Sequence, residues 1–170
     1  MVQAAAADLA LLIFRLSLGV VFVAHGYNHV FGGGRIAGTG RWFESLGMRP
    51  GIVHAWLASL TELVCGALLV LGFLTPFAAA GVVGTMLTAW LTNHRKNGFF
   101  IFRPGEGYEY VMVLTACGVL LGGVGAGGWS VDRAVGWFAP PGWLGLLVVA
   151  VAGFGGAALL LATAWRPHRT

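Results

Sequence analysis

Several ionisable side chains occur within long apolar runs, where an unpaired charge is expensive. A charged group at the centre of a lipid bilayer costs roughly 2.5–3.5 kcal/mol on insertion scales, so each one needs a partner or a function. Guanidinium, imidazole and carboxyl groups can pair with one another, carry protons or bind a polar ligand. The residues concerned are Arg15, His25, His29, Glu62, His94 and Glu109.

Arg15 and Glu62 are expected to lie near the middle of the first two apolar runs. At about 1.5 Å of helix per residue, Arg15 falls slightly toward the outer side and Glu62 close to the centre. We therefore predict a structural ion pair between them. Two roles remain open for this pair: a buried salt bridge that fixes the register of two helices, or a proton or substrate relay.

His25, His94 and Glu109 fall at a similar depth in the cytoplasmic half of three different runs. Such a layer predicts a small polar pocket that hydrogen-bonds the carbonyls of a quinone and exchanges its protons, with Trp90 and Tyr108 among its walls. The catalytic candidates are Glu62, His25, His94 and Glu109. The alternative is that each histidine is an interfacial residue satisfied by a carbonyl or by water. No HExxH spacing occurs, and we predict no metal site.

The composition indicates which elements must hold these side chains. Of the residues, 58% are hydrophobic and only 9% are charged, whereas soluble domains are about 25% charged. A lipid-spanning helix needs about 20 mostly apolar residues. The sequence therefore predicts an all-α integral membrane bundle, with a short interfacial helix near Arg41 to Met48 and spans at about 9–31, 52–74, 77–96, 108–126 and 142–165.

Basic residues are distributed unevenly between the loops, which indicates the orientation in the membrane. With five spans, one side carries only Arg133, and the N-terminus lies outside with the C-terminus in the cytoplasm. The other side carries Arg35, Arg41, Arg49, Arg95, Lys96, Arg103, Arg166 and Arg169. The formal charge of +4 is thus explained by topology, and no nucleic-acid motif is present.

Five sequence blocks resemble the DoxX family of small bacterial membrane proteins. They are RLSLGVVFVAHGYNHVFGG from Arg15, TELVCGALLVLGFLTPFAA from Thr61, NHRKNGFF from Asn93, GYEYVMVL from Gly107 and GVGAGGWSVDRAVG from Gly123. The resemblance implies a four-helix bundle linked to redox metabolism, related to the membrane subunit of thiosulfate–quinone oxidoreductase. It marks as family-typical Arg15, His25, Gly26, Glu62, His94, Glu109 and Asp132.

The resemblance also implies a division of the chain and a location. Residues 1–136 would form the four-helix domain, and residues 137–170 would add a fifth transmembrane helix, suited to docking, with a short basic tail. The small-residue spacing of Gly153 and Ala157 suits close helix packing, within the bundle or between subunits. The location would be the bacterial cytoplasmic (inner) membrane.

Three functions follow as alternatives. The first is a membrane subunit of a quinone-linked oxidoreductase or redox-stress complex, without a redox cofactor of its own, whose partner subunit holds the electron carrier. The second is a non-catalytic anchor or assembly subunit for such an oxidoreductase. The partner of the chain would be an oxidoreductase subunit or further copies of the chain itself. The third is a small transporter, which usually requires a larger bundle with inverted repeats.

Overall fold

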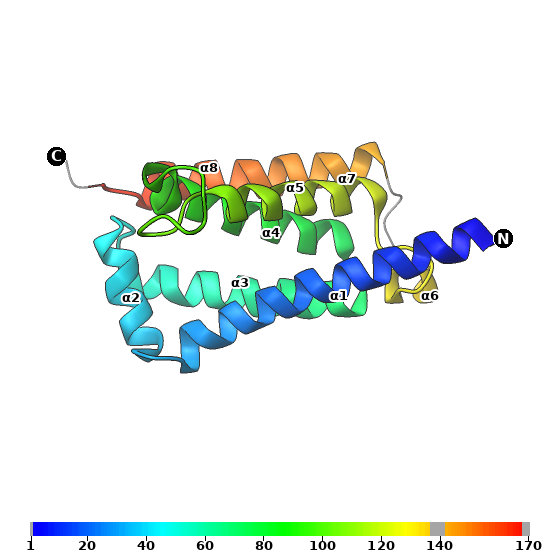
Figure 1. Cartoon of the computed structure of the whole chain (residues 1–170), viewed down its shortest axis with the longest axis horizontal. Helices are drawn as coiled ribbons and strands as arrows, with labels where there is room; N and C mark the ends of the chain where they lie inside the picture. The colour runs from blue at the N-terminus through cyan, green and yellow to red at the C-terminus, as the bar shows by residue number, and fades with distance from the viewer. Residues whose placement is uncertain (1, 137–141, 168–170) are drawn as a thin grey trace.

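The computed structural model of the chain describes residues 2–136 and 142–167 and is all-α, as predicted (Figure 1). No β-strand occurs in these two ranges. A 3-10 turn, η1, spans His94–Asn97, and a π-helical segment, η2, spans Val149–Gly155. The α-helices are α1 (Val2–Phe31), α2 (Arg35–Ser45), α3 (Gly51–Leu71), α4 (Thr75–Thr92), α5 (Glu109–Val124), α6 (Val131–Val135), α7 (Trp143–Val148) and α8 (Gly156–Ala164).

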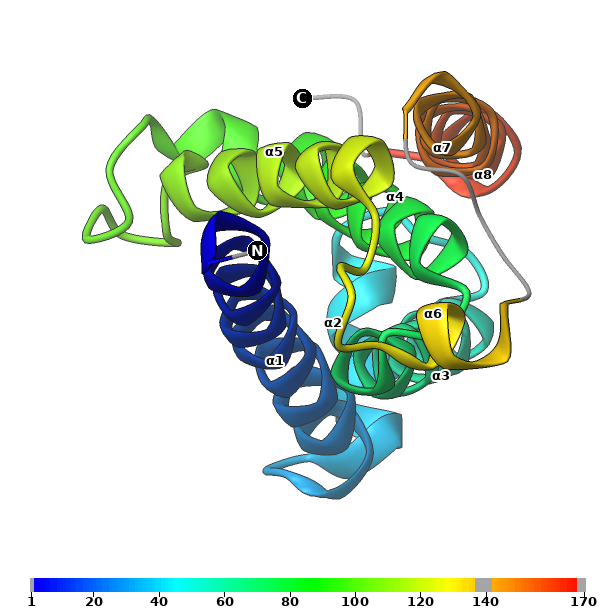
Figure 2. The ribbon, with the colours of Figure 1, turned by 90° about the vertical axis from the view of Figure 1, so that its right-hand side faces the viewer.

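The long helices run side by side, and α2 lies across one end of the bundle (Figure 1). Helix α3 packs between α1 and α4, and α4 packs between α3 and α5. The C-terminal helix, formed by α7, η2 and α8, covers α4 and α5. Viewed along the bundle, α1 and α5 lie on the same flank, and contacts between them are sparse (Figure 2).

Four helices are long and apolar enough to cross a membrane: Gln3–Phe31, Gly51–Leu71, Thr75–Thr92 and Trp143–Ala164. Helix α5 has 16 residues, about 24 Å of helix, and packs along α4. It ends at Val124, close to the predicted end of the fourth span at residue 126. The third predicted span extended too far, because the chain leaves the α-helix after Thr92 and turns through η1.

The end of the C-terminal helix is hydrogen-bonded to the rest of the bundle. At its far end, the Trp165 indole donates to the Leu46 carbonyl at 2.9 Å, and the Arg49 amide donates to the Ala164 carbonyl at 3.1 Å. This helix therefore finishes at the end where α2 lies. The loops bearing the predicted basic set meet at this same end (Figure 1); Arg169 falls outside the described residues.

Glycines allow the C-terminal helix to sit close to α4. A methyl group on Gly153 would lie 3.0 Å from the Ala80 carbonyl oxygen, and Ala157 is buried. The small-residue face of this helix is therefore used for packing within the bundle.

Helices α1 and α3 pack closely and run antiparallel. A methyl group on Gly19 would lie 2.7 Å from the Gly66 carbonyl oxygen, and one on Gly66 would lie 2.7 Å from the Gly19 carbonyl oxygen. Further along, Gly26 sits against Ser59 and Glu62. These contacts fix the register that brings the end of α1 beside the middle of α3.

We expect Gly66→Ala to lower the free energy of unfolding by about 1–3 kcal/mol, because the added methyl group has no space between two backbones. The measurement is SDS-driven unfolding of the protein in mild detergent. Gly156→Ala is the matched control, since a methyl group there meets no atom within 4 Å. Equal stability of the two variants would contradict the packing described.

Candidate functional site

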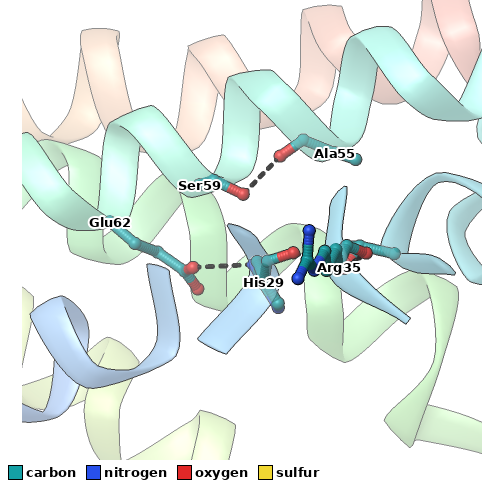
Figure 3. Close-up of polar contacts among 6 residues, drawn as sticks. His29, Arg35, Ala55, Ser59 and Glu62 are labelled. Carbon is teal, nitrogen blue, oxygen red and sulfur yellow. Dashed lines mark hydrogen bonds and ion pairs between the residues drawn. The ribbon is translucent and has the colours of Figure 1, made fainter. Parts of the chain in front are cut away.

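Glu62 is a carboxyl group buried in the middle of the bundle. It lies on α3 and is 4% exposed. Its Oε2 atom is 3.0 Å from Nδ1 of His29 in the last turn of α1 (Figure 3). The nearby Ser59 hydroxyl does not serve the carboxyl group, because it donates to the Ala55 carbonyl at 2.7 Å.

The contact of Glu62 with His29 is short but not aligned as a hydrogen bond. Glu62 Oε2 and His29 Nδ1 are both buried and both lack a hydrogen-bond partner of good geometry. An unsatisfied buried polar atom is costly, about 1–3 kcal/mol, and marks a place where a structure serves function or takes up a further group. The pair is therefore poised to hold a proton or to accept a polar ligand.

A small cavity adjoins Glu62 at the meeting point of four helices. Its lining comprises Val21, Phe22, His25, Glu62, Met86, Tyr110 and Leu114. The enclosed space has room for about one water molecule. Glu62 is buried at the cavity, whereas His25 at its edge is exposed and stacks on Tyr110 with ring centroids 6.5 Å apart. The cavity thus adjoins the flank between α1 and α5, where lipid would lie.

The remaining predicted pocket residues lie elsewhere, at the connection between α4 and α5. Trp90 and Tyr108 stack with centroids 5.4 Å apart. His94 Nδ1 faces the Glu106 carbonyl at 3.0 Å, and Glu109 Oε2 accepts from the Ile101 amide at 3.2 Å. None of these four predicted residues lines the cavity. The structure therefore divides the predicted pocket: His25 lies at the cavity with Glu62, and His94 and Glu109 organise the loop.

Arg15 does not pair with Glu62, and the predicted ion pair is wrong. The guanidinium is 1% exposed and donates to four backbone carbonyls. These belong to Leu69 at 2.8 Å, Val70 at 3.3 Å, Ala126 at 2.9 Å and Trp129 at 2.7 Å. Arg15 thereby joins α1, the end of α3 and the loop after α5.

The error has a physical cause in the register of α1 and α3. The depth estimate centred each apolar run independently. The glycine contacts instead slide Arg15 opposite Leu69, seven residues from Glu62 and about 10 Å along the helix. At that level α3 ends, where a helix leaves carbonyls short of donors. The Leu69 carbonyl accepts from the Gly72 amide at 3.1 Å, and the guanidinium adds bonds to Leu69 and Val70.

Asp132 complements Arg15 at the same end of the bundle. Its carboxylate accepts from the Leu74 amide at 2.8 Å, the Thr75 amide at 3.1 Å and the Thr75 hydroxyl at 2.8 Å. These amides open α4, where a helix has unpaired donors and favours negative charge. Gly72, in the left-handed conformation, completes this turn, and a side chain there would collide with Arg15.

Sequence reasoning gave too little weight to His29 and Tyr110. His29 stood out only as one of the ionisable side chains within the apolar runs, and Tyr110 was not singled out. A search for a second donor for Glu62 would have found His29, once Arg15 is assigned to helix-end carbonyls. Among the described residues, no three His, Cys, Asp or Glu side chains gather as a metal site would require.

Comparison with known proteins identifies the family. The sequence model of the DoxX family matches residues 10–95, half of the 170-residue chain. The chain belongs to the DoxX family. The uncharacterized membrane protein Rv3486 of Mycobacterium tuberculosis (strain ATCC 25618 / H37Rv) is 31% identical over 133 residues, covering 73% of this chain and 80% of that protein. No solved structure matches the present chain.

This DoxX protein is therefore a membrane protein with a helical bundle. Arg15, His25, His29 and Glu62 all fall within the segment that matches the family, whereas Tyr110 and Asp132 follow it.

We expect Arg15→Gln to cost about 3 kcal/mol of stability or more, because it leaves buried carbonyls unpaired. Since Arg15 and Glu62 do not touch, its cost should add to that of Glu62→Gln within about 0.5 kcal/mol in the double variant. Detergent unfolding of the two single variants and the double variant measures this. Arg133→Gln, on an exposed side chain, is the control. A large coupling energy between the two substitutions would show that Arg15 and Glu62 do interact, as the predicted ion pair requires.

Proposed function

We propose that this DoxX protein is the membrane subunit of a quinone-linked oxidoreductase and that Glu62 handles the protons of the quinone. The observation that carries the proposal is a carboxyl group, 4% exposed, beside a cavity whose edge is exposed on a lipid-facing flank. An ionisable residue kept in this position is a functional site by default in a membrane protein. A quinone dissolved in the bilayer would approach from that flank.

The side chains that line the cavity, together with His29 beside Glu62, fit the polar end of a quinone. Glu62 Oε2 and His29 Nδ1 have unused hydrogen-bonding capacity. The enclosed space accepts one oxygen-sized group and is too small for a ring. The aromatic ring would therefore be held at the edge, by the stacked side chains of His25 and Tyr110. Apolar neighbours such as Phe22, Met86 and Leu114 complete the lining.

In this function the protein provides binding, orientation and protons. A bound quinone supplies the electron-accepting chemistry. His25 and Tyr110 position it, and the apolar lining excludes water from the reacting end. Glu62 holds or releases a proton at Oε2, within reach of a group in the cavity. Electrons would come from a cofactor on a partner subunit. Cofactors carry the redox chemistry in such enzymes, and the protein supplies binding and orientation.

The alternative function, an anchor or assembly subunit, depends on a different part of the structure, the end of the bundle where α2 lies. The end with α2 gathers the basic loops, and the last helix is fastened there through Trp165. Positive-inside topology already accounts for basic loops in a membrane protein. The anchor would nevertheless gain support from a co-purifying oxidoreductase that carries no quinone.

We expect Glu62→Gln to lower quinone-linked turnover of the native-membrane complex by about 100-fold, because general acid–base catalysis is lost. The amount of protein in the membrane should stay unchanged, since the amide has the same shape. Turnover and membrane abundance are both measured. Glu44→Gln, on the exposed side of α2, is the control. Undiminished turnover would exclude Glu62 from proton handling.

We expect a photoreactive quinone analogue, added to membranes that hold the full chain, to label α1 near His25 and α5 near Tyr110. Peptide mass spectrometry locates the adducts, and excess natural quinone should suppress them. Tyr110→Leu should reduce the labelling several-fold, with Tyr27→Leu, on an exposed stretch of α1, as the control. Adducts confined to other helices, or adducts that natural quinone does not suppress, would contradict the site.

A further inference from the structure

His29 and His25 face different parts of the bundle. Both lie on α1, one helical turn apart, and both approach Glu62. His25 is exposed at the flank between α1 and α5 and stacks on Tyr110. His29 has a side chain only 16% exposed and lies in the last turn of α1, toward the end of the bundle that α2 covers.

Helix α2 closes over His29 with two aromatic rings and a hydrogen bond. The ring centroids of Trp42 and Phe43 lie 6.5 Å and 6.0 Å from that of His29. The Thr39 hydroxyl donates to the His29 carbonyl at 2.9 Å and lies 3.3 Å from the Arg35 carbonyl. The exposed Arg35 marks where this arrangement reaches water (Figure 3). From Glu62, the side chains thus pass through one imidazole to an aqueous end.

We propose that His29 is the proton relay between Glu62 and the aqueous phase at the α2 end. The inference rests on the proposed function, to which it adds the route and side of proton uptake. Water protonates the outer ring nitrogen of His29, Nε2. Nδ1 then passes its proton across the 3.0 Å contact to the Glu62 carboxylate. The imidazole is neutral again after the transfer, in its other tautomer, and no electrons move.

The other groups near the pair do not offer a competing route. The Ser59 hydroxyl is committed to the Ala55 carbonyl. His25 and Tyr110 stand on the lipid side of the cavity. His54, on α3, is buried; its Nε2 faces the Arg49 carbonyl at 3.2 Å and its Nδ1 has no hydrogen-bond partner. It lies eight residues from Glu62, about 12 Å along the helix, and the ion pair of Glu62 is with His29. Arg35 is the cation on α2 beside His29 and cannot give up its proton. His29 is therefore the exchangeable group between Glu62 and water.

The test follows protonation of the Glu62 carboxyl by infrared spectroscopy, in nanodiscs that hold the full chain and no quinone. The band is assigned by its loss in Glu62→Gln. After a rapid pH jump, His29→Gln should slow equilibration of this band by about 100-fold, as expected when a positioned acid–base group is removed. His94→Gln, at the connection between α4 and α5 and outside the cavity lining, is the control and should leave the rate unchanged. Added imidazole should restore part of the rate in His29→Gln, which a purely structural role would not allow.

Two outcomes would overturn the relay: an unchanged rate in His29→Gln, or equal slowing in His94→Gln and His29→Gln. If His29→Gln does not fold, His29→Asn replaces it under the same criteria. Because no quinone is present, the result separates from the proposed function. A slowed band without quinone labelling would retain the relay and reject the quinone site, and labelling with an unchanged band would do the reverse.

Discussion

The Arg15 guanidinium is the interaction on which the rest of the bundle depends. Its hydrogen bonds to Leu69, Val70, Ala126 and Trp129 join three segments that are far apart in the sequence. In lipid, a backbone carbonyl without a donor costs several kcal/mol, and the guanidinium donates to four carbonyls near the ends of helices. Asp132 supplies the opposite charge and caps the start of α4. These bonds stabilise one end of the bundle. The bundle can then contain a polar pair at its middle, Glu62 with His29, whose hydrogen bonds are incomplete.

The contrast between the two buried polar groups defines their roles. Arg15 has its donors engaged by well-placed carbonyls, which is how a structural group is stabilised. Glu62 and His29 face one another with unused capacity and a cavity alongside. The same fold therefore contains a fully satisfied polar hub and a partly satisfied polar pair, about 10 Å apart along α3. Only the second has the unused hydrogen-bonding capacity on which the proposed chemistry depends.

Sequence reasoning could predict the class of fold and the identity of the polar residues, because both follow from the cost of charge in lipid. The long helical segments followed from apolar length. A short helix was predicted near Arg41 to Met48; α2 forms in that loop but spans Arg35–Ser45. Partner choice could not be predicted, since it depends on register. The contact of Gly19 with Gly66 sets that register, and nothing in the apolar runs themselves reveals which glycines meet. The side-chain commitments of His94 and Glu109 depend likewise on the path of one loop.

The depth of Glu62 has an electrical consequence. It is the twelfth residue of the 21-residue α3, so about 17 Å of helix separate it from the α2 end, roughly half of a 30 Å hydrocarbon layer. A proton that moves from that end to Glu62 crosses about half of the transmembrane voltage, worth about 1 kcal/mol per 100 mV. Occupancy of this carboxyl would then respond to the energised state of the membrane.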